Sequence, residues 1–302
     1  MIQYLKHNGI DKNRWDDCIA HAVNGNGYAW SWYLDVASPG WEALVEITDD
    51  SYLSVMPLTC KRKYFINYLC QPFFVQQLGV FSTQALTSET VVSFLKAIPQ
   101  KYHLIEIRLN EGNRLPDAMQ GVTYHRNQLL HLNDSYDVLL SNYHENTMRN
   151  LKKSLNHGLQ VVKGVPMEAV IALFRSDRGR LVTHWGEMEY GRLLRIADAA
   201  LTSSNAFVYG IQHPRSQKII CGAFFLYSHD RITFLFSGNS ILGRETQAMT
   251  FLIDAVVREF AGRSLVLDFE GSDNENLSRY YAGFGSATVR YPDYRVPLFN
   301  KR

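Results

Sequence analysis

Two carboxylates at alternate positions end an apolar run near the C-terminal end of the chain. Residues 265–267 have strand character, and Asp268 and Glu270 follow them before a Gly-Ser turn. Side chains two residues apart on a strand share one side, so we expect both carboxylates on the same side of the strand's end. Ligands of α/β folds gather beside the carboxyl ends of strands. There Glu270, its pKa raised by partial desolvation, would accept a proton from an attacking amine, and Asp268 would orient the acceptor or hold Glu270 in place.

The same two residues have a structural alternative, in which they cap the following helix or pair with a nearby arginine. We expect no metal site, because no His or Cys falls at ligand spacing beside them. Hydrolysis by paired carboxylates is disfavoured, since same-side neighbours on one strand have Cα atoms only about 7 Å apart. The four cysteines stand in no nucleophile motif and are interpreted as buried, reduced thiols.

A basic group forms a second candidate site. Arg149, Lys152 and Lys153 fall on adjacent positions of a predicted helix over residues 143–157. Such a face can grip the phosphates of a cofactor, a nucleotide sugar or a tRNA acceptor stem. A solvated helix face is the structural alternative, and the Lys61-Arg62-Lys63 run is interpreted as an exposed turn.

These residues are carried by alternating helices and strands. Apolar periodicity and turn residues predict the elements that follow. The helices are expected at 13–23, 89–98, 143–157, 166–175, 187–201 and 244–260, and the strands at 43–48, 52–59, 104–109, 122–132, 206–212, 219–227, 231–237 and 265–267. Residues 71–79 are expected to form an ordered loop, and the connection with Arg178 and Arg180 to line a cleft or to form a capped surface loop.

Composition narrows the class of protein. The chain has 302 residues, 46% of them hydrophobic and 20% charged, which is typical of a soluble globular protein. A net charge of +2 gives no large field of the kind found in nucleic-acid binders. No apolar stretch approaches the roughly 20 residues needed to cross a bilayer, and no signal peptide precedes the first helix, so we expect a cytoplasmic location and no membrane insertion.

Several motifs, in their order, resemble one family. Three strands, a loop, a helix, a strand and a short helix form the order of the GNAT superfamily of N-acyltransferases. Its tandem-domain branch contains the Fem-type peptidoglycan aminoacyltransferases and the cellulose-biosynthesis-type acetyltransferases. The matching segments are the basic helix ending in Gly158, Asp268-Phe-Glu-Gly-Ser272, Tyr280-Tyr-Ala-Gly-Phe-Gly285, Met56-Pro-Leu58 and the stretch from Pro72 to Gly79.

The resemblance implies two tandem GNAT-like α/β domains, 1–140 and 141–302, each a mixed central sheet flanked by helices, with the transfer site near their junction. It places the pyrophosphate of an acyl-CoA at the loop with Gly238, Asn239, Gly243 and Arg244. The glycine pattern of that loop is degraded, so an ordinary strand-to-helix connection stays an alternative.

The resemblance also bears on the leaving group. The Fem-type pattern has Lys where this chain has Tyr281, which disfavours a nucleotide-linked peptidoglycan substrate. A tyrosine on the final helix is similar to the residue that protonates the departing thiolate in many acyl-CoA-using members. Tyr280 and Tyr281 are therefore joint candidates for that role.

Three functions follow from the resemblance. The first is transfer of an acyl group from acyl-CoA, as co-substrate, to a small-molecule amine by direct attack in a ternary complex. The second is a bacterial cell-wall activity, in which an aminoacyl-tRNA is the donor and a peptidoglycan precursor the acceptor. The third is a non-catalytic GNAT-like binding module.

Overall fold

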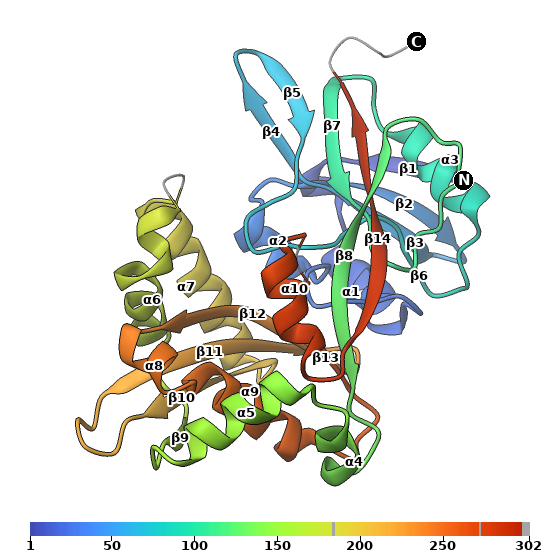
Figure 1. Cartoon of the computed structure of the whole chain (residues 1–302). Helices are drawn as coiled ribbons and strands as arrows, with labels where there is room; N and C mark the ends of the chain where they lie inside the picture. The colour runs from blue at the N-terminus through green and yellow to red at the C-terminus, as the bar shows by residue number, and fades with distance from the viewer. Residues whose placement is uncertain (183–184, 272, 298–302) are drawn as a thin grey trace. The chain divides into compact units, whose positions relative to one another are not determined.

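The computed structural model describes residues 1–182, 185–271 and 273–297. The chain forms two compact units (Figure 1), unit 1 with Met1–Arg126 and Val289–Arg302, and unit 2 with Asn127–Thr288. The segment from Val289 onwards belongs to unit 1, because strand β14 (Ala287–Val296) pairs with β7 (Tyr102–Arg108) of that unit. The sequence-based division into 1–140 and 141–302 stays a prediction about domains.

Unit 1 contains two groups of strands. The strand order is β1-β2-β3-β6 in the first group and β4-β5-β7-β14 in the second. The strands are β1 (Ile2–Leu5), β2 (Glu42–Thr48), β3 (Ser51–Leu58), β4 (Cys60–Lys63), β5 (Ile66–Leu69) and β6 (Phe81–Ser82), and the α-helices are α1 (Lys12–His21), α2 (Ser31–Ala37) and α3 (Ser88–Ala97). Residues 71–79 connect β5 to β6 without a helix, as expected from their Pro and Gly residues.

Unit 2 is a mixed sheet with the order β8-β13-β12-β11-β10-β9, in which β12 and β13 run parallel and the other recorded pairs antiparallel. Its strands are β8 (Val122–His131), β9 (Gln160–Lys163), β10 (Ala206–Gln212), β11 (Ile219–Ser228), β12 (Arg231–Asn239) and β13 (Val266–Asp268). Its α-helices are α4 (Tyr136–Ser141), α5 (Glu145–Leu155), α6 (Met167–Ser176), α7 (Glu187–Thr202), α8 (Ile241–Glu245), α9 (Ala248–Phe260) and α10 (Glu275–Ala282).

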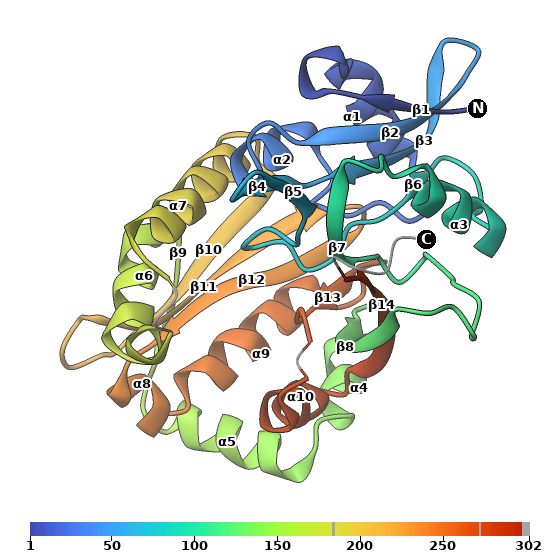
Figure 2. The same ribbon diagram turned by 90° about the horizontal axis from the view of Figure 1, so that it is seen from above.

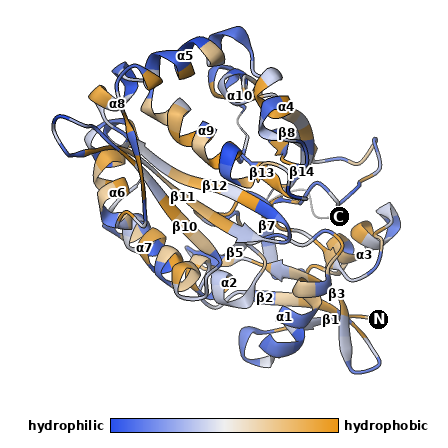
Figure 3. Ribbon diagram, turned by 90° about the horizontal axis from the view of Figure 1, so that it is seen from below, coloured by the Kyte–Doolittle hydropathy of each residue, from blue (hydrophilic) through white to orange (hydrophobic). Residues whose placement is uncertain are grey.

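The core of unit 2 lies between its sheet and α9. Figure 3 shows α9 largely in hydrophobic colours beside the strands, and its Leu252, Ile253 and Val256 are fully buried. The aromatic residues of the strands pack into the same core, and Phe207 stacks on Phe225 with ring centroids 4.9 Å apart. These aromatic residues of the strands therefore contribute to the packing of the sheet. The expected α/β class, with mixed sheets flanked by helices, is confirmed.

The single helix predicted over 244–260 is wrong, because the structure has two helices there. α8 ends at Glu245, and Gln247 adopts a left-handed conformation with φ of +59° before α9 begins. Thr246 Oγ1 donates to the carbonyl of Leu242, and this hydrogen bond caps the C-terminal end of α8. The apolar periodicity of residues 249–260 belongs to α9 alone. The five residues of α8 are too few to show a periodicity of their own, so in the sequence they look like the first turn of α9.

The buried carboxylate of Asp254 on α9 forms hydrogen bonds with α4 and with the segment between α4 and α5. Asp254 is 2% exposed, and its Oδ1 accepts hydrogen bonds from Tyr136 (2.9 Å) and Tyr143 (3.3 Å). Burial raises the pKa of Asp254, against the hydrogen bonds and the charge of Arg258, which lower it. The charged carboxylate therefore opposes folding at neutral pH relative to its protonated form.

We expect Asp254→Asn to be more stable than the wild type at pH 7, by on the order of 1 kcal/mol, since the amide oxygen still accepts from both tyrosines. The folded-state pKa is raised above the unfolded value, so the wild type loses stability as pH rises through that interval. The advantage of the variant should therefore shrink as pH falls to about 4. Urea unfolding at several pH values measures it. A variant less stable at pH 7 would show that the ion pair with Arg258 outweighs burial.

Candidate active site

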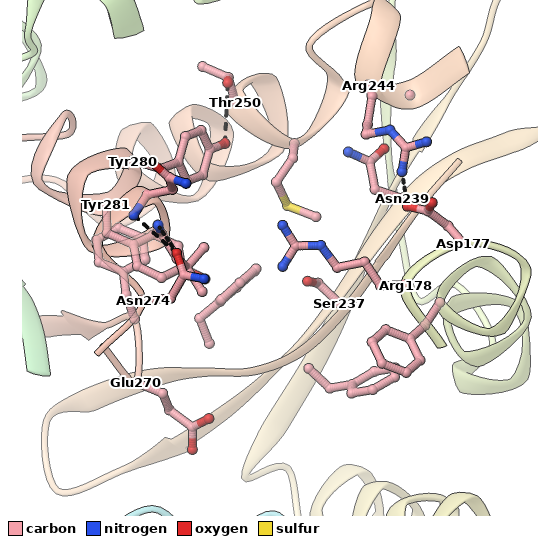
Figure 4. Close-up of a pocket in the computed structure, with 18 of the residues that line it drawn as sticks. Asp177, Arg178, Ser237, Asn239, Arg244, Thr250, Glu270, Asn274, Tyr280 and Tyr281 are labelled. Atoms are coloured by element: carbon pink, nitrogen blue, oxygen red, sulfur yellow. Dashed lines mark hydrogen bonds and ion pairs between the residues drawn. The ribbon is translucent and has the colours of Figure 1, made fainter. Parts of the chain in front are cut away.

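A cavity of about 880 Å³ lies in unit 2, where β12 and β13 stop pairing (Figure 4). The parallel register runs from Arg231 beside Val266 to Thr233 beside Asp268, whereas β12 continues to Asn239. The residues that line the cavity come from α6 and the turn after it, the second half of β12, α8, α9, the turn after β13, and α10. An edge of β12 is thus presented to the cavity beyond Thr233.

That edge contains a β-bulge. On β11, Phe224 faces Phe236 and Phe225 faces Phe234, so Leu235 is an extra residue without a partner in the register. A bulge leaves the peptide group of its extra residue outside the ladder. Leu235 lines the cavity, and peptide N–H groups released from pairing at such a position can stabilise a developing oxyanion.

Both candidate tyrosines line the cavity. Tyr281 stacks on Phe269, with ring centroids 4.6 Å apart and planes 13° apart, and is 6% exposed. The hydroxyl of Tyr280 lies 3.2 Å from Thr250 Oγ1 on α9. Burial raises the pKa of each tyrosine, so both keep their protons at neutral pH and remain able to donate one. For Tyr281 the charge of Glu270 raises the pKa further, and that of Arg178 lowers it.

The structure separates the two carboxylates. Glu270 lines the cavity, whereas Asp268 is 2% exposed and does not. Asp268 Oδ2 accepts from Arg231 Nη1 at 2.7 Å, and its Oδ1 accepts from the backbone N–H of Glu270 at 2.8 Å. The expectation of a shared side is wrong, because β13 ends at Asp268 and Glu270 already has a φ of +55°. Asp268 instead holds the turn that carries Glu270, and Ser272 of the motif lies outside the described residues.

The glycines of the predicted phosphate loop are required by packing. A Cβ at Gly238 would lie 2.3 Å from the carbonyl oxygen of Val170 on α6, and one at Gly243 would lie 2.5 Å from that of Ile220. Gly238 does not line the cavity, whereas Asn239, Gly243 and Arg244 do. Ser240 Oγ accepts from the N–H of Gly243 at 3.0 Å, so this peptide is already engaged within α8.

Cations enter the cavity from two directions. Arg244 forms an ion pair with Asp177, and Figure 4 shows the guanidinium of Arg178 reaching towards the middle of the cavity. Within the described parts of the chain Arg178 has no ion-pair partner. Of the two roles left open for this connection, cleft or surface loop, the structure favours the first, because Asp177, Arg178 and Trp185 all line the cavity.

The basic group of α5 lies elsewhere. Arg149, Lys152 and Lys153 are exposed, and none of them lines the cavity. Arg149 donates to Asn146 one turn earlier on the same helix. The structure therefore does not bring this group together with the other predicted site residues.

Sequence reasoning missed the aromatic side of the cavity. Phe174 of α6 packs on Phe236 of β12 with ring centroids 4.9 Å apart, and Trp185 lies 5.4 Å from Phe174. Leu235, Met249 and Asn274 also line the cavity. No local pattern marks these residues, since their proximity arises from the packing of α6 and α10 at the end of the sheet.

Comparison with solved structures identifies the fold. The chain is similar to the crystal structure of FemX, with a TM-score of 0.67 and 12% identity over 97% of both chains. It is similar to a tandem GNAT protein from the clavulanic acid biosynthesis pathway (TM-score 0.51, 12% identity, 100% of both chains). A third match is the C-terminal domain of a putative lysylphosphatidylglycerol synthetase from Agrobacterium fabrum (TM-score 0.51, 10% identity, 94% of this chain and 91% of that one).

The chain therefore has the tandem GNAT-type fold that its motifs predicted, with the Fem-type resemblance confirmed at the level of fold. No family model matches the sequence, and no curated protein matches it either. Among the described residues no helix is both long and apolar enough to cross a membrane.

Proposed function

We propose that unit 2 is an acyltransferase, which moves an acyl group from an acyl-CoA thioester to an amine held in the same cavity. The observation that carries the proposal is the exposed edge of β12, with a bulge at Leu235, which opens onto a cavity lined by Glu270 and Tyr281. A cavity of about 880 Å³ is large enough to hold a reacting thioester and an amine together.

The amine nitrogen attacks the thioester carbonyl, and a C–N bond forms as the oxygen takes up negative charge. Peptide N–H groups of β12 around Leu235 stabilise that charge. Glu270 takes a proton from the acceptor's ammonium group, directly or through one bound water, and so generates the neutral amine that attacks. Figure 4 shows its carboxylate turned away from the tyrosines, so we place the amine on the Glu270 side and the leaving group on the Tyr281 side.

The C–S bond then breaks, and the thiolate leaves with a proton from Tyr281. Tyr281 is favoured over Tyr280 because the hydroxyl of Tyr280 is already engaged with Thr250. The raised pKa of Tyr281 keeps its hydroxyl protonated at neutral pH, so a proton is available beside the departing thiolate.

Arg178 and Arg244 supply the charge for the donor's phosphates. Both line the cavity, and a guanidinium binds phosphate oxygens through two parallel N–H groups. Gly238 and Gly243 contribute only by allowing close packing, so donor affinity should depend on the arginines rather than on an open glycine cradle.

A second candidate is transfer from an aminoacyl-tRNA to a peptidoglycan precursor. The exposed Arg149, Lys152 and Lys153 favour it, since such a face suits a nucleic-acid backbone, and so does the resemblance to Fem-type proteins. Both donors belong to the cytoplasm, where we place the activity. A binding module without catalysis is the third candidate.

The candidates are separated by incubating the protein with acetyl-CoA or aminoacyl-tRNA and a panel of small amines, amino sugars and cell-wall precursors. Amine-dependent release of thiol supports the first candidate, and amine-dependent loss of the aminoacyl group from tRNA supports the second. Replacing Arg149, Lys152 and Lys153 by Gln should leave thiol release unchanged and weaken only the tRNA reaction. Binding of a donor without transfer to any amine would support the third candidate, the binding module without catalysis.

A further inference from the structure

The hairpin of β4 and β5 carries two aromatic side chains at its tip. β4 and β5 pair antiparallel from Cys60 beside Leu69 to Lys63 beside Ile66, so the loop consists of Tyr64 and Phe65 alone. Tyr64 is 82% exposed and Phe65 is 88% exposed. Rings of this size are ordinarily buried at least in part, so their position needs a reason.

The backbone of the loop disfavours these residues. Tyr64 has a φ of +48° and Phe65 a φ of +65°, so both central positions of the turn are left-handed, as in a type I′ turn. Asn-Gly is the usual pair there, because large side chains in the left-handed region crowd their own backbone. Because the rings are exposed, their burial does not offset this strain. Neither the turn nor the core of unit 1 therefore explains an aromatic pair at this place.

The flanks of the tip are positively charged. Lys61, Arg62 and Lys63 are exposed, and residues 60–69 contain no Asp or Glu. The Arg62 guanidinium lies 5.5 Å from the ring centroid of Phe65, and the Lys63 ammonium lies 5.3 Å from that of Tyr64. Cations on an edge strand protect it from pairing with other chains, which accounts for the charges but not for the rings.

The tip also extends beyond the strands that support it. β5 pairs with β7 from Asn67, opposite Tyr102, the first residue of β7. Residues 63–66 therefore project past the end of that sheet, and Figure 1 shows the hairpin standing out from the rest of unit 1. A projecting pair of rings can meet a flat surface without any movement of the strands.

We propose that this tip docks unit 1 on an anionic phospholipid surface, with Tyr64 and Phe65 in the interface and Lys61, Arg62 and Lys63 on the headgroup phosphates. Aromatic rings are stable at the boundary between headgroups and acyl chains, and neighbouring cations add electrostatic attraction to an anionic leaflet. For this loop the proposal replaces the expectation of no membrane insertion, and it is independent of the proposed transfer reaction.

A lipid surface fits the tip better than a nucleic acid. Each ring already has a cation of its own hairpin over one face, which covers a face that a stacked base would need. The charges form a short cluster at the end of a projection, whereas a nucleic-acid strand is held along a groove that follows its backbone. The interface needs only a shallow contact with rings and cations together.

Sedimentation of the full chain with large vesicles tests the proposal, using phosphatidylcholine alone or with 30% phosphatidylglycerol. We expect binding to the anionic vesicles only. The double variant Tyr64→Asn with Phe65→Gly supplies the residues that a type I′ turn prefers, so the hairpin should stay folded while binding falls at least tenfold. The triple variant Lys61→Gln, Arg62→Gln and Lys63→Gln should also lose at least tenfold and most of the salt dependence.

The matched control removes the same charge elsewhere. Lys96, Arg215 and Lys218 are exposed and lie outside both the hairpin and the cavity, so their triple replacement by Gln should leave vesicle binding within about twofold. Equal losses in the two triple variants would overturn the proposal, since binding would then follow net charge. Wild-type binding by the Tyr64→Asn, Phe65→Gly variant would overturn it too, as would binding to poly(U) RNA with none to anionic vesicles.

Discussion

Replacement of Glu270 by Gln should lower kcat by about 100-fold or more, while the melting temperature changes little. Gln keeps the size and hydrogen bonding of the side chain but cannot take the proton that the acceptor's ammonium group must lose before it attacks. Glu270 lines the cavity and is not part of the apolar core, so its replacement should leave the packing intact. Steady-state turnover and thermal unfolding of the same preparation measure both effects.

Glu275→Gln is the matched control. Glu275 is exposed at the start of α10 and does not line the cavity, so this change should leave kcat within about twofold. Unchanged turnover in the Glu270 variant would assign proton removal to water or to the substrate. An unfolded Glu270 variant would show instead that the carboxylate is structural, as one interpretation of the sequence held.

Asp268→Ala should reduce the free energy of unfolding by about 3 kcal/mol, because it removes one partner of a buried ion pair. The side chain of Asp268 is 3% exposed and that of Arg231 is 20% exposed, so the remaining guanidinium would be largely buried. The hydrogen bond that holds the N–H of Glu270 would be lost as well. Urea unfolding measures the change.

An exposed ion pair is the control for Asp268. Glu187 pairs with Arg175 but its side chain is 79% exposed, so Glu187→Ala should cost less than about 1 kcal/mol. An Asp268→Ala variant with wild-type stability and lost turnover would contradict the structural role and restore a catalytic one.

Most strands and helices of unit 2 could be predicted because their signals are local. β10 occupies residues 206–212 as expected, and the buried apolar residues of α9 recur at helical spacing. β14 was missed, since Pro292 and Asp293 break the alternation of its apolar residues and its pairing partner β7 lies far away in the sequence. Such a strand is defined by its neighbour more than by its own residues.

The residues of the candidate site could be predicted where a sequence motif lies beside the cavity in the fold. Glu270, Tyr280 and Tyr281 follow the strand whose end opens the cavity, and all three line it. Gly238 was predicted to belong to the phosphate loop, but it lies in β12, where its missing side chain makes room for α6. A glycine kept for close packing and one kept for a ligand look alike in sequence.

The cavity position of Arg178 was equally hard to predict from the sequence. Arg178 precedes Gly179 in a connection that left two roles open, and only the packing of α6 on β12 turns it towards the cavity. The basic residues of α5 formed the more regular pattern and yet lie outside it. Regular spacing reports on a helix face, whereas a site is assembled from several elements.

Calorimetric titration of acetyl-CoA into the wild type and two arginine variants measures whether the cavity of unit 2 binds the acyl donor. Arg178 lines the cavity, whereas Arg180, which lies in the same 3-10 helix (Arg178–Leu181), is exposed and does not line it. We predict binding to the wild type, a Kd at least tenfold weaker for Arg178→Gln, and a Kd within about twofold for Arg180→Gln. No binding of any CoA thioester by the wild type, or equal weakening by both variants, would rule out donor binding in this cavity.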